Sequence, residues 1–282
     1  MRSALILLAG LFFFSTTSVR ADNQESLHDK VIRVGELRCG YALWPGLLEK
    51  DPNTGAMSGL FYDYMEQLGS SMQIKIVWAE EVPWGDIVEA LQARRIDAHC
   101  AGAWTNAIRG KFVDFTTPII FHPINAYVRE GDTRFDNNLS AINSPDVTIS
   151  IVDSESAATV AKTDFPKAKT ISMPKGTEGA QMILNVLHKK ADITFTDPSM
   201  AQEIMKNNPG KLRQVQAQFP LRVFGVGLAI RKGETTLKDS LNVATNQLLW
   251  AGGLEKILNK YEKFPGQFLR VAQPYISIAP KN

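Results

Sequence analysis

The stretch QIKIVWAEEVPWGDIVEALQARRIDAH, residues 73–99, has the pattern of a strand, a helix and a second strand. Apolar and β-branched residues dominate 73–79, apolar residues recur at helical spacing over 84–93, and a short apolar run starts at Ile96. Strands joined through a helix run parallel and need helices on their faces. The stretch therefore predicts an open α/β sheet that binds ligands at the carboxyl ends of its strands.

The same alternation continues on both sides of this stretch. We expect strands over 32–37, 147–152, 169–173 and 193–196, extended runs over 125–129 and 223–230, and helices over 59–69, 154–162, 179–188, 237–250 and 254–261. A turn and helix start are expected at Asp197-Pro198-Ser199, and Gly252-Gly253 separates the last two helices.

The two extended runs flank an inserted α/β unit, which predicts two lobes joined by two crossing strands. We expect residues 22–126 plus 226–282 to form the first lobe and residues 127–225 the second. Such a hinge leaves a cleft, and clefts between domains are the usual place for a small-molecule site.

Residues 1–21 have the pattern of an export leader, with a positive start at Arg2, an apolar run over 4–14 and small residues before Ala21. The apolar run is too short to span a bilayer. We expect cleavage after Ala21 and a soluble periplasmic protein, without a lipid anchor because no cysteine lies near the cleavage site. A secreted eukaryotic protein is the alternative.

The charge balance argues against nucleic acid as a partner. Without residues 1–21, the chain has 29 Lys and Arg against 29 Asp and Glu. Binding to phosphate backbones needs a concentrated basic surface, and the sequence offers only short pairs such as Arg94-Arg95. The four histidines are scattered, so we expect neither a metal site nor a cofactor.

Two cysteines, Cys39 and Cys100, each follow a short strand candidate. An exported chain meets an oxidising compartment, where such a pair can form a disulfide if the two strands are neighbours in a parallel sheet. Two separately buried thiols are the alternative.

Arg109 stands just beyond a predicted strand end, in the aromatic-flanked stretch AGAWTNAIRGKFVDFTTP over 101–118. A guanidinium can donate two parallel hydrogen bonds to a carboxylate, which suits recognition of a small anionic group. A solvated surface arginine is the alternative.

From residue 31 to 261 the chain resembles the periplasmic amino-acid-binding proteins, family 3 of the solute-binding proteins that serve ABC importers. The resemblance is carried by six segments in a shared order: IRVGELRCGYALWP, SGLFYDYMEQLG, WGDIVEALQARRIDAHCAG, NAIRGKFVDFTTPI, KKADITFTDPS and GVGLAIRKGETTLKDSLNVATNQLL. It implies the two-lobed type II fold of these proteins, an amino-acid-like ligand, an importer in the membrane and a monomer.

Carried over position by position, the family's carboxylate-binding arginine matches Arg109 and its acidic partner for the ligand ammonium matches Asp197. The two groups would bind both ends of a zwitterion when the cleft is shut. Asp197 also suits the N-cap of the helix that follows, and one oxygen can cap while the other binds.

Further ligand positions follow from the resemblance. Tyr41 and Trp44 match the aromatic residues that pack on the ligand side chain, and Gly102 belongs to the same proposed site. Phe61 is expected in the core instead.

The chain departs from the family at Trp104 and Asn106, where the family has hydroxyl residues, and at the turn of Glu155 and Ser156. Ser156 can still contact a ligand carboxylate. We expect Glu155 to point to solvent from the first helical turn; if it points inward, the ligand should be more cationic than a plain amino acid.

Three function classes follow. The first is a binding protein that delivers a small polar solute to an importer, with no catalytic residues. The second is a periplasmic enzyme similar to the cyclohexadienyl dehydratases, a lyase with Glu155 or Asp197 as general acid. The third is the sensor module of a receptor or lytic enzyme.

Overall fold

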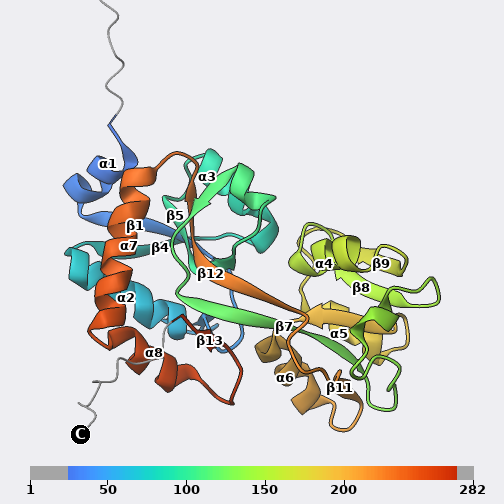
Figure 1. Ribbon diagram of the computed structural model, residues 1–282. Coiled ribbons are helices and arrows are strands. Elements are labelled where there is room, and N and C mark those ends of the chain that lie inside the picture. The colour runs from blue at the N-terminus through green and yellow to red at the C-terminus, as the bar shows by residue number, and fades with distance from the viewer. Residues whose placement is uncertain (1–24, 272–282) are drawn as a thin grey trace, which may run out of the picture.

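Two α/β lobes lie side by side, joined by two long strands that run from one lobe into the other (Figure 1). The computed structural model describes residues 25–271, so the expected leader, residues 1–21, lies outside the described residues. The connecting strands are β7 (Ile120–Arg129) and β12 (Arg222–Arg231), which pair antiparallel between the lobes. The predicted two-lobed α/β architecture is confirmed.

The first lobe has a sheet of strand order β4-β1-β5-β12. Strand β1 pairs parallel with β4 and β5, and β12 closes the sheet antiparallel to β5 and to the short β6. The strands are β1 (Glu36–Tyr41), β4 (Lys75–Glu81), β5 (Ala98–Trp104) and β6 (Val113–Phe115). The helices are α1 (Leu27–Val34), α2 (Leu60–Met72), α3 (Ile87–Gln92), α7 (Thr235–Trp250) and α8 (Gly253–Tyr261).

Helices cover both faces of this sheet. Leu228 and Ile230 of β12 belong to the large core under α2, α7 and α8, whereas Ala229 belongs to the smaller core under α3. Successive side chains of a strand point to opposite faces, so β12 is buried on both. This explains its continuous apolar run.

The second lobe has strand order β7-β10-β8-β9, with β11 added along β7. Strand β8 runs parallel to β9 and β10, and β10 runs antiparallel to β7. The strands are β8 (Thr148–Val152), β9 (Lys169–Met173), β10 (Ile193–Thr196) and β11 (Leu212–Gln214). The helices are α4 (Ser156–Asp164), α5 (Ala180–Leu187) and α6 (Pro198–Asn207).

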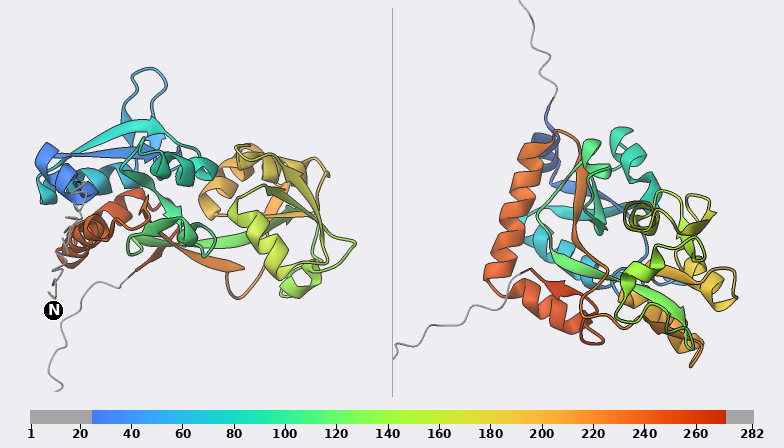
Figure 2. Two further views of the ribbon diagram at one scale, coloured as in Figure 1. Left: turned by 90° about the horizontal axis from the view of Figure 1, so that it is seen from above. Right: turned by 45° about the vertical axis from the view of Figure 1, so that its right-hand side comes forward.

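Short elements complete the fold. They are the hairpin β2 (Glu49–Lys50) and β3 (Met57–Ser58), the 3-10 turns η1 (Trp84–Asp86), η2 (Arg109–Lys111) and η3 (Leu139–Ile142), and β13 (Leu269–Arg270), which pairs with β7. Figure 2 shows the lobes from two further sides, with the C-terminal helices on the first lobe.

Each lobe has its own core. The core of the second lobe draws on residues 124–215, and the main core of the first lobe draws on residues before and after that range. The boundaries expected near residues 126 and 226 stay a prediction. No helix within residues 25–271 combines the length and the apolar character needed to cross a membrane.

The strand predicted over 32–37 is wrong at its start. Residues 27–34 form α1, capped by Ser26, whose side chain accepts a hydrogen bond from the Asp29 amide. Leu27 and Val31, one helical turn apart, are the buried residues of this helix. Gly35 ends it with φ of 74°, a conformation that glycine adopts without strain. Ile32 was predicted to begin a buried strand because it is apolar, but it is 49% exposed.

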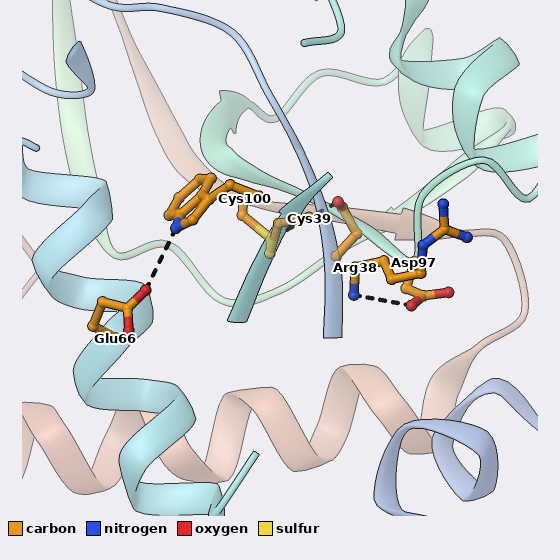
Figure 3. Close-up of a disulfide and its surroundings, with 7 residues drawn as sticks. Arg38, Cys39, Glu66, Asp97 and Cys100 are labelled. Carbon is orange, nitrogen blue, oxygen red and sulfur yellow. Dashed lines mark hydrogen bonds between the residues drawn. A yellow bond between two sulfur atoms is a disulfide. The ribbon is translucent and has the colours of Figure 1, made fainter. Parts of the chain in front are cut away.

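The predicted disulfide between Cys39 and Cys100 is present (Figure 3). The cysteines lie within β1 and β5, which are parallel neighbours, and their Cα atoms are 5.4 Å apart. Close by, the Arg38 amide donates to Asp97 Oδ2 at 3.0 Å, at the start of β5 (Figure 3). The central strands of the first lobe are therefore joined covalently and by hydrogen bonds.

Replacing both Cys39 and Cys100 by alanine is expected to lower the free energy of unfolding by about 4 kcal/mol in the chain-entropy model, because the bond spans 61 residues of the unfolded chain. Urea unfolding of the variant and of the wild type measures the loss. The wild type under reducing conditions is the control and should lose a similar amount. A loss below about 1 kcal/mol would contradict this account of the bond.

Candidate functional site

A cavity of about 530 Å³ lies between the lobes. Its walls come from the loops after β1, β4 and β5 in the first lobe and from the amino-terminal ends of α4, α5 and α6 in the second. The lining includes three tryptophans, three charged residues and a serine: Trp44, Trp84, Trp104, Arg109, Glu155, Asp197 and Ser156. The cavity thus opens at strand ends, where a parallel sheet is expected to bind ligands.

Arg109 is placed by the short turn η2. The side chain of Asn106 accepts a hydrogen bond from the Arg109 amide at 2.8 Å, which fixes the turn. The guanidinium Nη2 donates to the Trp84 carbonyl at 2.9 Å. Burial lowers the pKa of Arg109, and the nearby Glu155 carboxylate opposes this shift. Arg109 therefore lines the cavity as a partly buried cation and not as a solvated surface residue.

Asp197 directly follows β10 and caps α6 from the second lobe. Its Oδ1 accepts hydrogen bonds from the Ser199 amide at 3.0 Å and the Met200 amide at 3.2 Å. Only 2% of the residue is exposed, and burial raises the pKa of its carboxyl although the two amides act against this. The predicted N-cap is confirmed, and Oδ2 makes neither capping bond.

Glu155 lines the cavity from the N-cap position of α4, where its side chain makes no capping bond. Burial raises the pKa of Glu155, and the positive charge of Arg109 opposes the shift. Within residues 25–271 no ion pair joins the two side chains, but each charge shifts the pKa of the other group from a longer distance. The solvent-facing placement expected from the sequence is not found.

Three tryptophans form an aromatic wall. The Trp44 ring meets Trp84 edge to face at 5.0 Å and Trp104 at 6.0 Å between centroids, and it stacks on the buried Phe61 at 6.0 Å. Phe61 lies in the core, as expected. Trp84 was not expected in the site; the only signal was its place just after a strand, at a helix start.

Two buried histidines lie against these rings. Trp104 donates to Nδ1 of His122 at 3.4 Å, and Nε2 of His99 is 3.1 Å from the Val82 carbonyl. Burial lowers the pKa of His122 to about 3 and that of His99 to about 4, so both are neutral at physiological pH. They add no positive charge beside the cavity.

Three of the predicted ligand residues do not line the cavity. Tyr41 is buried against Trp78, and its hydroxyl accepts a hydrogen bond from Lys50 Nζ at 3.1 Å. Gly102 has φ of 72°, and a Cβ there would lie 2.4 Å from Phe61, so its role is structural. Asn106 holds the turn of Arg109. These positions adjoin the site in sequence, but Tyr41 and Asn106 use their side chains, and Gly102 its backbone conformation, to support the scaffold.

The cavity lining is rich in carboxylates. Among the described residues that line it, Arg109 is the one basic residue, and the acidic residues are Glu81, Glu155, Glu178, Asp197 and Glu203. Glu81, Glu178 and Glu203 were not predicted from the sequence. Glu203 stands three residues after Met200 in α6, and both residues line the cavity. This helical spacing could have indicated that Glu203 shares a face with Met200. Within the described chain, no three His, Cys, Asp or Glu side chains are grouped to hold a metal ion.

Residues 44–264 match the family of bacterial extracellular solute-binding proteins, family 3, and the chain belongs to this family. Among curated proteins it is 23% identical to an L-arginine-binding protein of Pseudomonas aeruginosa, over 84% of this chain and 89% of that protein. It is also 23% identical to a probable histidine-binding protein of Neisseria gonorrhoeae, over 73% of this chain and 75% of that protein.

Solved structures agree on the fold. The chain is 25% identical to the ancestral amino acid-binding protein AncCDT-1, described as a precursor of cyclohexadienyl dehydratase, with a TM-score of 0.72 over 84% of this chain and 100% of that chain. A putative binding component of an ABC transporter from Wolinella succinogenes, complexed with lysine, is 22% identical with a TM-score of 0.70, over 82% and 97% of the two chains.

The variant Glu155→Gln is expected to raise the thermal stability of the protein near neutral pH. A carboxyl whose pKa is raised by folding binds protons more tightly in the folded chain, so its contribution to stability is present at low pH and is lost as pH rises through the folded pKa. Thermal unfolding across pH measures the difference between variant and wild type.

The gain should shrink as pH falls toward the ordinary glutamate value of 4.5. Glu130→Gln, at an exposed position, is the control and should show no such gain. A Glu155→Gln variant less stable than the wild type near neutral pH would contradict the burial of this charge.

Proposed function

We propose that the protein captures a small cationic, amino-acid-like solute in the interlobe cavity and delivers it to an ABC importer. One observation carries the proposal: Arg109 from the first lobe and Asp197 from the second line a single cavity. A carboxylate on the guanidinium and an amine on the Asp197 carboxylate would be held together only while the lobes are closed. Recognition and closure are then one event.

Hydrogen bonds to the charged groups of the cavity can supply the binding free energy of a micromolar complex. A hydrogen bond to a charged group contributes roughly 1.5 to 3 kcal/mol net, and a micromolar complex needs about 8 kcal/mol. Three or four such bonds, less the cost of ordering the solute, reach that level. No covalent step is needed.

The excess of carboxylates supports a solute with additional positive charge. A plain zwitterion would supply no counter-charge to Glu155, whose carboxylate is disfavoured by burial, beyond the single amine held by Asp197. A cationic group is also attracted to the faces of the tryptophan wall. The Pseudomonas aeruginosa relative is described as an L-arginine-binding protein and the Wolinella succinogenes protein is complexed with lysine, and both of these solutes carry an additional positive charge.

The cellular setting follows from the family. Its members are extracellular solute-binding proteins, and the proposed leader over residues 1–21 would deliver the chain to the periplasm. There a monomer would pass its solute to the membrane subunits of the importer.

A lyase on the same scaffold is the second candidate, favoured by one observation. Glu155 combines a raised pKa with a place in the cavity, as a general acid requires, and one structural neighbour is described as a precursor of cyclohexadienyl dehydratase. Incubation of the protein with prephenate or arogenate tests it. Loss of substrate that disappears in Glu155→Gln would establish the enzyme; no turnover would leave binding as the function.

Calorimetric titration with L-arginine, L-lysine, L-histidine and neutral and acidic amino acids is expected to show binding of one solute per protein, with cationic amino acids tightest. Arg109→Lys should weaken binding at least roughly thirtyfold, because a lysine cannot donate the paired bonds to a carboxylate. Asp197→Asn should weaken it similarly while the helix cap survives, since asparagine caps as well as aspartate.

Lys162→Met removes an exposed charge of the second lobe and is the control, with binding like the wild type. Equal binding of arginine by wild type, Arg109→Lys and Asp197→Asn would refute the proposed roles. Failure of every tested solute to bind the wild type would refute the proposed ligand class.

A further inference from the structure

Lys175 makes an ion bridge from the second lobe to the first. Its Nζ lies 3.0 Å from Asp86 Oδ1 and 3.1 Å from Glu89 Oε1. Lys175 stands just after β9, whereas Asp86 ends η1 and Glu89 lies in the first turn of α3. One ammonium thus bridges two carboxylates of the other lobe.

The turn that carries Lys175 is well defined. Thr177 donates its amide to the Pro174 carbonyl at 3.1 Å and its hydroxyl to the same carbonyl at 2.7 Å. Gly176 has φ of 88°, the left-handed conformation that the third position of a type II turn requires. The geometry therefore presents Lys175 at the tip of a four-residue turn.

The first lobe provides a seat for the lysine stem at Gly85. A Cβ at this position would lie 2.6 Å from Cε and 2.8 Å from Cγ of Lys175. Only glycine leaves room for the stem to lie against the backbone here. Because the φ of Gly85 is outside the left-handed region, alanine would displace the lysine without straining the backbone.

The bridge stands at the edge of the cavity. Gly85 and its neighbour Trp84 line the cavity from the first lobe, and Gly176 and Thr177, next to Lys175, line it from the second. Any rotation that separates the lobes at this edge also separates Lys175 from Asp86 and Glu89. The bridge can therefore exist only when this side of the cavity is shut.

We propose that Lys175 is a positioning residue that holds the lobes closed and so slows release of the solute. The inference rests on the proposed function, in which closure retains the solute. The bridge is partly exposed, with 37% of the Lys175 side chain accessible, so its effect is modest and screened by salt. Loss of the bridge is expected to raise the dissociation rate of L-arginine about fivefold.

Small-angle X-ray scattering without added solute tests the closure directly. Lys175→Met and Gly85→Ala should each give a larger radius of gyration than the wild type, and Lys175→Arg should retain the wild-type value. Stopped-flow dissociation of L-arginine should be faster in the first two variants. Raising the salt concentration should speed dissociation from the wild type and change Lys175→Met little.

Two controls separate the bridge from a general loss of charge. Lys162→Met should match the wild type in both measurements. Adding Asp86→Asn and Glu89→Gln to Lys175→Met should cause no further change, because the interaction is already absent.

Scattering tests whether the bridge holds the lobes closed, and the dissociation rate tests whether closure retains the solute. If Lys175→Met scatters like the wild type, or if arginine leaves both at the same rate, the proposed role of Lys175 is overturned. If L-arginine does not bind the wild type, the proposed ligand is at fault, and scattering alone still decides whether the bridge holds the lobes closed.

Discussion

The antiparallel pairing of β7 with β12 is the constraint on which the site depends. Strand β12 continues into the sheet of the first lobe beside β5, which leads to the turn of Arg109. Strand β7 continues into the second lobe beside β10, which ends at Asp197. Each charged group thus stands at the end of a strand that is hydrogen-bonded to one of the two connecting strands. Rotation at the hinge would move the two groups relative to each other.

The electrostatics of the cavity complement this geometry. Burial raises the pKa values of Glu155 and Asp197 and lowers that of Arg109, so the ionised form of each group is disfavoured by its surroundings. Such unfavourable charges are common at functional sites, because a solute of opposite charge relieves them. The Asp197 carboxylate is retained at low exposure because two helix amides already stabilise one of its oxygens. Its place as a helix cap keeps it fixed while the solute is absent.

Much of the fold could be predicted from periodicity alone. Strands β9 and β10 were predicted at their observed bounds, since each is a short apolar or alternating run between turn signals. Helix α1 was missed because two of its apolar residues, Ile32 and Val34, are exposed, and the cap formed by Ser26 is a weak signal in isolation. The site was harder to predict. Trp44 and Asp197 line the cavity, but Tyr41 points into the core a few residues away.

This failure has a physical cause. Residues near a strand end alternate between the two faces, so proximity in sequence does not establish a place in the cavity. Glu155, Glu178 and Glu203 come from three separate segments of the second lobe and Glu81 from the first, so only the folded chain brings these carboxyls to one cavity. The acidic character of the cavity, and with it the preference for a cation, emerges from the three-dimensional arrangement.

A crystal structure of the complex with the amino acid that binds tightest would test the central claim most directly. The account predicts a solute between the lobes, with its carboxylate on the Arg109 guanidinium and its amine on the Asp197 carboxylate. A solute that contacts neither side chain, or that lies outside the interlobe cavity, would contradict it.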